Sequence, residues 1–67
     1  MKAIAALRVA LGMTQCEFAN AIGISQAHLS ALERGRERVS RDVGLAIFDR
    51  YRRRLSRLGY SLEDLLR

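Results

Sequence analysis

The stretch TQCEFANAIGISQAHLSALERG, residues 14–35, decides how this chain folds. It holds two helix starts: Thr14 with Glu17 matches the T-x-x-E capping box, and Ser25 is a favoured N-cap residue. Gly23 lies between the two apolar runs, where helices commonly end in a left-handed residue. The pattern therefore predicts helices over residues 15–22 and 26–34, joined by a tight turn.

The same signals for the beginning and end of a helix predict three more helices. Glycines follow the other apolar-periodic runs at Gly12, Gly35 and Gly59. Ser40 is a good N-cap, and Ser61 with Asp64 resembles a second capping box. We expect the remaining helices over residues 2–11, 41–58 and 62–66.

Composition agrees with a small helical domain. The chain has 67 residues, 49% of them hydrophobic and 28% charged, and contains no proline. This length suits one domain with a limited core, and the composition favours an all-α globular fold. We predict a compact five-helix domain over residues 1–67, with its core in 4–48 and an extended fourth helix and tail in 49–67. Apolar residues at helical spacing are the expected core: Ile4, Leu7, Leu11, Phe18, Ala19, Ile22, Leu29, Leu32, Val43, Ile47, Tyr51, Leu55 and Leu58.

Gly44 is the exception, because it falls inside the helix expected over residues 41–58. Glycine in a helix interior costs about 1 kcal/mol relative to alanine. Either another helix packs closely against Gly44, or the fourth helix begins later than the pattern suggests.

The net charge of +5 indicates a polyanionic partner, nucleic acid before membrane. A solvated basic helix face is the alternative explanation of the same charge. No apolar stretch is long enough to span a membrane. Most of the excess charge comes from arginines after Glu33: Arg34, Arg36, Arg38, Arg41, Arg50, Arg52, Arg53, Arg54 and Arg57.

Catalytic and metal chemistry find little support in the sequence. His28 and Cys16 are the only residues of their types, so we expect no metal site and no cofactor. No nucleophile–base arrangement, phosphate-binding glycine loop or carboxylate pair is recognisable, and we expect no enzyme. A single cysteine and no secretory segment indicate a reducing compartment, the cytoplasm.

The helix expected over residues 26–34 has a surface that the core does not use. Leu29 and Leu32 point inward, and the opposite side carries only small or polar groups with no acid. Such a helix can enter the major groove, where glutamine pairs with adenine and alanine methyls meet thymine methyls. An ordinary exposed helix is the alternative, but glutamate and lysine would be its usual residues. The candidate base-reading residues are Gln26, Ala27, His28, Ser30 and Ala31.

At this point a resemblance is specific. The pattern L7-R8-x-x-x-G12-x-T14-Q15-x-E17-F18-A19-x-x-I22-G23-I24-S25-Q26-x-x-L29-S30-x-L32-E33-R34-G35 resembles the helix-turn-helix of the phage-repressor (Cro/Xre-like) family. It covers residues 4 to about 48 without a gap. The resemblance implies a lambda-repressor-like fold in which Ala19 is small because two helices cross there.

The resemblance also implies roles for individual residues. Gln15 resembles the family glutamine that binds a phosphate and braces the recognition helix. Arg8 and Glu33 match a family ion pair between the first helix and the end of the third. The residues expected to meet the DNA backbone are Gln15, Ser25, Arg34, Arg36 and Arg38.

The segment between Ser40 and Gly59 is longer than is usual in the family, and its leucine-rich end suggests a dimer surface. The alternative is that these residues complete the core of a single chain. The residues expected at the dimer surface are Tyr51, Leu55, Leu58, Tyr60, Leu62, Leu65 and Leu66.

The favoured function is a homodimeric repressor, often of its own promoter, that reads a palindromic operator in double-stranded DNA. One alternative is an antitoxin-like module whose C-terminal helices bind a partner protein. Another is a membrane-surface binder that uses the basic fourth helix.

Overall fold

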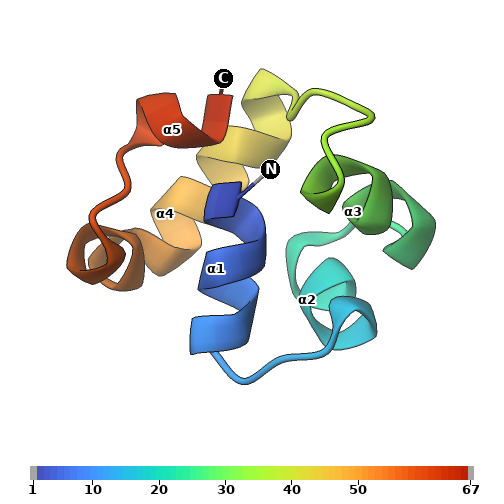
Figure 1. Ribbon diagram of the computed structural model, residues 1–67, viewed down its shortest axis with the longest axis horizontal. Coiled ribbons are helices and arrows are strands. Elements are labelled where there is room, and N and C mark those ends of the chain that lie inside the picture. Colours follow the sequence, from blue (N-terminus) through green and yellow to red (C-terminus); the bar gives the residue numbers. More distant parts are fainter. Residues whose placement is uncertain (1, 67) are drawn as a thin grey trace.

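The computed structural model describes residues 2–66 and consists of five helices joined by short loops (Figure 1). No strand occurs in this part of the chain. The all-α prediction is confirmed, and each helix agrees with its expected bounds to within one residue. The helices are α1 (Lys2–Ala10), α2 (Gln15–Ile22), α3 (Gln26–Glu33), α4 (Arg41–Leu58) and α5 (Leu62–Leu66).

The expected helix caps form. Thr14 Oγ1 accepts from the backbone N–H of Glu17 at 3.1 Å, and the Glu17 carboxylate accepts from the backbone N–H of Thr14 at 2.9 Å. Ser61 and Asp64 make the same reciprocal pair before α5. Gly23 ends α2 in the left-handed region with φ 79°. These local bonds satisfy helix-end groups that would otherwise lack partners, so they fix where the helices begin and end.

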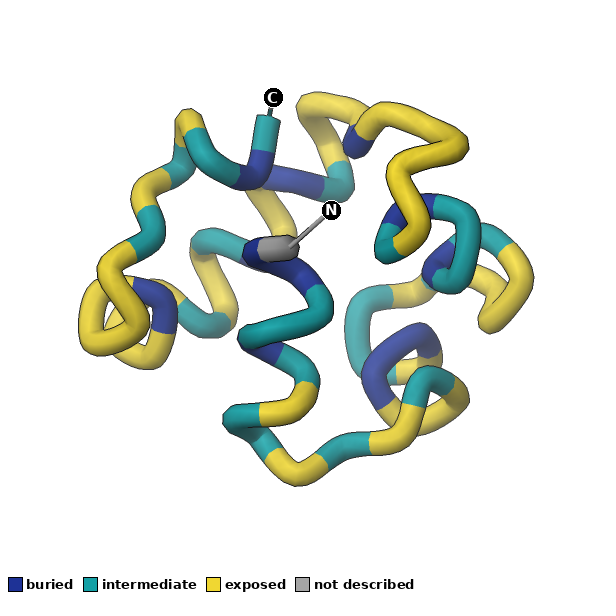
Figure 2. Tube along the Cα trace, viewed as in Figure 1, coloured by how far each residue is buried: buried dark blue, intermediate teal, exposed yellow. Residues whose placement is uncertain are grey.

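The core lies around α1, which packs against α3, α4 and α5 (Figures 1 and 2). Each large side chain buried here contributes roughly 1.5–3 kcal/mol through removal of apolar surface from water. The prediction from helical spacing holds for most of these positions. It was wrong for Leu58, which is 38% exposed because it lies in the last turn of α4, and it missed Ala3, Val39 and Leu65. The buried apolar residues are Ala3, Ile4, Leu7, Phe18, Ala19, Leu29, Leu32, Val39, Ile47, Leu55 and Leu65.

Gly44 is explained by close packing, because α4 does begin at Arg41. A Cβ atom at Gly44 would lie 2.5 Å from Leu66 Cδ2 and 3.5 Å from Val39 Cγ1. Glycine therefore lets α5 fold back onto the first turns of α4.

The fourth helix is not one regular helix. The backbone of Tyr51 leaves the helical region, with φ −120° and ψ 27°, so α4 bends there. The Tyr51 ring stacks on Phe18 at a centroid distance of 5.6 Å. Ile47 before the bend and Leu55 after it are both fully buried. The bend thus allows both halves of α4 to follow the core.

The C-terminal leucines require a correction of the expected dimer surface. Leu55 and Leu65 have 0% of their area exposed, so neither can present a surface to a second chain. For these two residues the alternative was right: a short chain uses its apolar side chains to complete its own core. Of the expected set, Leu58 is 38% exposed. The half-buried members are Tyr51, Tyr60, Leu62 and Leu66.

Candidate nucleic-acid interface

The turn between α2 and α3 fixes how α3 is presented. Gly23 reverses the chain, and the backbone N–H of Ile24 donates to the carbonyl of Ala19 at 3.0 Å. Ala19 is 1% exposed, and Leu29 and Leu32 hold the inner side of α3 in the core. Helices α2 and α3 lie together at one side of the molecule, with α3 at its edge (Figure 1). The outer side of α3 is therefore open to a large partner.

We call five residues of α3 the reading face. Gln26 and Ala27 in the first turn are exposed, while the other three are half-buried. The face has no acidic group and no large apolar group. Neither a negative charge nor a bulky apolar side chain therefore opposes its placement in a DNA groove. Its exposed end is the N-terminal turn of α3, the part that helix-turn-helix proteins bring to base edges. The reading face is Gln26, Ala27, His28, Ser30 and Ala31.

Two residues beside the reading face keep donors available for phosphates. Ser25 Oγ accepts from the backbone N–H of His28 at 3.0 Å, which leaves the hydroxyl hydrogen free to donate outward. Gln15 is the first residue of α2, and the first N–H groups of a helix have no partner within it. Such N–H groups favour an anion by both hydrogen bonding and the helix dipole.

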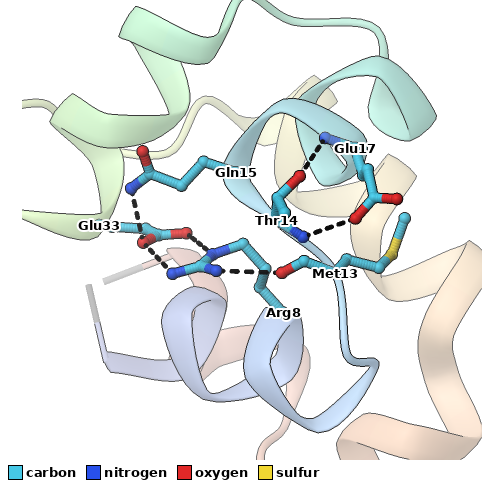
Figure 3. Close-up of polar contacts among 6 residues, drawn as sticks. All are labelled: Arg8, Met13, Thr14, Gln15, Glu17 and Glu33. Atoms are coloured by element: carbon cyan, nitrogen blue, oxygen red, sulfur yellow. Dashed lines mark hydrogen bonds and ion pairs between the residues drawn. The ribbon is translucent and has the colours of Figure 1, made fainter.

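A polar network joins α1, α2 and α3 behind this surface (Figure 3). Glu33 Oε2 accepts from Arg8 Nε at 2.7 Å, and Glu33 Oε1 accepts from Arg8 Nη2 at 3.1 Å. The amide of Gln15 donates to the same Oε1 at 3.1 Å. Arg8 also donates to the carbonyl of Met13 at 3.0 Å. The ion pair that the resemblance implied is thus present, and Gln15 holds the end of α3 as a brace would.

Burial and charge act in opposite directions on Glu33. Burial raises the pKa of this carboxyl, but the hydrogen bonds from Arg8 and Gln15 and the charge of Arg8 outweigh it, so the pKa is lowered. The hydrogen bond to Glu33 raises the pKa of Arg8. Both groups therefore stay charged near neutral pH, and the network holds α3 at a fixed position relative to α1 and α2.

The loop after α3 adds positive charge next to the reading face. Arg34, Arg36 and Arg38 are all exposed, as is Arg41 at the start of α4. Their guanidinium groups can donate to phosphate oxygens in bidentate fashion. Glu37 is the one acid of this loop, and its Oε2 lies 2.6 Å from His28 Nδ1.

A second basic region lies far from α3. The second half of α4 and Leu11 line an open hollow of about 590 Å³. The C-terminal end of α4 lies at the opposite end of the longest axis from α3 (Figure 1). The exposed arginines after α3 and those of the second half of α4 thus form two separate basic surfaces. The arginines of this hollow are Arg50, Arg52, Arg53, Arg54 and Arg57.

The sequence did not single out two features of these surfaces. The contact between Glu37 and His28 depends on the path of a loop, which no local pattern encodes. Leu45 and Phe48 line a hollow of about 450 Å³ together with Leu62. Leu45 is 39% exposed, and its spacing from Val43 and Ile47 places it on the outer side of α4, a signal that helical periodicity did contain.

Other kinds of site are less well supported. Within residues 2–66, no three histidine, cysteine or acidic side chains gather as metal ligands would. No helix in this part of the chain has the length and apolar character needed to cross a membrane.

Comparison with known families agrees with the geometry. The helix-turn-helix family matches residues 4–58, which extends past the expected core to the end of α4. No curated protein and no solved structure gave a significant match. Because the match covers most of the chain and includes the α2–turn–α3 unit, the chain belongs to the helix-turn-helix family of Cro/Xre-type DNA-binding regulators.

Proposed function

We propose that this protein is a sequence-specific transcriptional repressor that reads an operator in double-stranded DNA with α3. The observation that carries the proposal is the reading face itself. Gln26 and Ala27 in its first turn are exposed, it contains no acid, and α3 is held by the Arg8–Glu33–Gln15 network. A rigid support of this kind is what precise hydrogen bonding to base edges requires.

In the proposed complex, the first turn of α3 lies in the major groove. Gln26 makes a bidentate pair with adenine, and the methyl of Ala27 meets a thymine methyl. Arg34, Arg36 and Arg38 neutralise phosphates, and the N-terminus of α2 at Gln15 binds one more. Phosphate contacts fix the register, while contacts to base edges select the sequence.

Repression then requires only that the protein occupy its operator. A domain that covers a promoter excludes polymerase, and no catalytic group or cofactor takes part. A regulator of this kind acts on DNA in the cytoplasm of a bacterial cell and is encoded by the bacterium or by a phage.

We further propose that the protein acts as a homodimer on a palindrome. The C-terminal surface is revised, since Leu55 and Leu65 are buried. The hollow lined by Leu45, Phe48 and Leu62, with Asp49 and Arg52 also in its lining, offers a largely apolar surface for a second copy. A two-fold dimer would place two α3 helices about one turn of DNA apart, and a palindromic operator would match that symmetry.

The same hollow supports one other candidate function. An antitoxin-like protein would cover Leu45, Phe48 and Leu62 with a partner protein instead of a second copy. The two functions predict different oligomeric states for the purified protein: a homodimer for the repressor, and no such dimer where the surface needs a partner protein.

The experiment that tests the proposed function is selection from a randomised duplex library at near-physiological salt. An enriched inverted repeat would support a dimeric repressor, and its spacing would give the dimer geometry. Retention without enrichment would mean that positive charge alone binds DNA, which would contradict the proposal. Loss of all DNA would contradict it as well and would favour the partner-protein function.

A further inference from the structure

The contact between His28 and Glu37 joins the reading face to the following loop. His28 is the third residue of α3, and Glu37 lies in the loop before α4. Glu37 Oε2 and His28 Nδ1 are 2.6 Å apart, so the two side chains are in direct contact. The side chain of His28 is 36% exposed and that of Glu37 is 52% exposed. The imidazole is thus held on one edge while part of the ring remains open to solvent.

This contact determines which ring nitrogen carries the proton. An ionised carboxylate carries no proton, so a bare Nδ1 would set two lone pairs against each other at 2.6 Å. The ring nitrogen that faces Glu37 is therefore the one that carries N–H. A neutral imidazole has one N–H and one bare nitrogen, which makes Nε2 the bare nitrogen. Among the residues that the structure describes, Nε2 has no hydrogen-bond partner. His28 therefore carries an acceptor at Nε2 whenever the imidazole is neutral.

We infer that Glu37 is a positioning residue for base reading, which fixes the tautomer of His28 so that Nε2 accepts from an exocyclic amine of a base. The inference rests on the proposed function and names one determinant of its specificity. In the major groove the amines are N4 of cytosine and N6 of adenine. The opposite tautomer would carry N–H at the same position and would favour guanine O6 or thymine O4.

A purely structural role for Glu37 is the competing explanation. The contact could only fasten the loop, and it could also lower affinity for every sequence, because Glu37 stands between two arginines expected to meet phosphates. Either role would change stability or overall affinity. A contact that only fastens the loop would still fix the tautomer, but neither role would change the base preferred at one position. The tautomer tests the contact, and the base preference tests its role in reading.

The tautomer can be measured without DNA. His28 is the only histidine of the chain, so long-range proton–nitrogen NMR spectra contain one imidazole. At about pH 8.5, where an ordinary imidazole is neutral, we expect the Nδ1–H form in the wild type. In Glu37→Ala we expect that form to give way to one that carries N–H at Nε2. The control is Glu63→Ala, which removes the same charge from an exposed position of α5 and should leave the spectrum unchanged.

The base preference is measured on the selected operator at the same pH. His28→Ala first identifies the base pair that His28 reads. We expect the wild type to prefer an amine-bearing base there, and Glu37→Ala to lose about fivefold of that preference. Glu63→Ala should keep it. Thermal unfolding of each variant followed by circular dichroism establishes that the exposed substitutions leave the fold intact.

The outcomes separate this inference from the proposed function. An Nε2–H tautomer in the wild type, or an unchanged spectrum in Glu37→Ala, would overturn the inference whatever the DNA results. If the protein selects a specific operator but Glu37→Ala leaves the base preferred by His28 unchanged, the inference is overturned and the repressor function is kept. If the wild type shows the expected tautomer but enriches no DNA sequence, the repressor function is contradicted. The inference, which rests on that function, then fails with it.

Discussion

Arg8 and Glu33 join α1 to the last residue of α3 through two contacts, of 2.7 Å from Nε and 3.1 Å from Nη2. Their side chains are 19% and 8% exposed. Gln15 adds a third donor to the same carboxylate from the start of α2. One acid therefore fixes the relative positions of the three helices on which the reading face depends (Figure 3).

Removing one partner of this pair should strongly destabilise the fold. We expect Arg8→Met to lower the free energy of unfolding by about 3 kcal/mol, because Glu33 is left charged and largely buried. The double variant Arg8→Met/Glu33→Leu should lose less than this single variant. Urea denaturation measures all three chains.

The matched control is Arg52→Met, which breaks an exposed pair with Asp49 of 3.5 Å. Its effect should be below about 1 kcal/mol. Equal losses in Arg8→Met and Arg52→Met would show that the first pair does not act as a buried ion pair.

The lowered pKa of Glu33 predicts a dependence of stability on pH. The unfolded chain has an ordinary glutamate pKa of about 4.3, and folding lowers that value. The stabilisation is therefore fully present above the unfolded pKa and is lost as the pH falls through the folded pKa. Urea denaturation between about pH 6 and pH 3 should show a steeper loss in the wild type than in Glu33→Gln.

The control for this dependence is Glu63→Gln, which changes an exposed residue of α5. Glu63→Gln should keep the wild-type slope. An identical slope in Glu33→Gln would mean that the Arg8 and Gln15 contacts do not favour the ionised carboxylate.

Gly44 predicts a coupling between α4 and α5. Alanine in a helix interior gains about 1 kcal/mol over glycine, but its Cβ would meet Leu66 Cδ2 at 2.5 Å. We expect Gly44→Ala to change wild-type stability little, since displacement of Leu66 offsets the gain. In a Leu66→Ala background the same substitution should stabilise by about 1 kcal/mol. Equal effects in both backgrounds would show that Leu66 does not constrain this position.

Local signals explain why the helices could be predicted. Thr14, Ser25 and Gly23 act on groups within a few residues, so the sequence carries their effect directly. The burial of Leu55 and Leu65 depends on the bend at Tyr51 and on the return of α5 to α1 and α4. Those are long-range events, and for this reason apolar spacing alone could not separate core leucines from surface leucines.

The candidate site shows the same division. The reading face followed from helical periodicity, and the Arg8–Glu33 pair followed from a family resemblance. The contact of Glu37 with His28 bridges a helix and a loop nine residues apart, where no periodicity applies. The exposed side of a helix can therefore be predicted from the sequence more readily than the side-chain contacts that modify that surface.

The revised dimer surface predicts the effect of a single charge. Leu45→Glu should fold, because Leu45 is 39% exposed, and should shift the protein toward monomer by burying a charge against the partner copy. Sedimentation at several concentrations measures the shift. Val9→Glu is the control, since Val9 is 66% exposed on α1 and lies outside the hollow. A wild type that is monomeric at all concentrations would contradict the homodimer and favour a partner protein at this surface.

The most direct test of base reading by α3 is the ratio of affinities for the selected duplex and a shuffled duplex of the same composition. We expect Gln26→Ala to lower this ratio by about fivefold or more, which corresponds to 1 kcal/mol or more of lost base discrimination. Arg36→Ala should weaken both affinities alike and lower the salt dependence by about one phosphate contact. A ratio that stays at the wild-type value in Gln26→Ala, with the fold intact, would contradict recognition through the reading face.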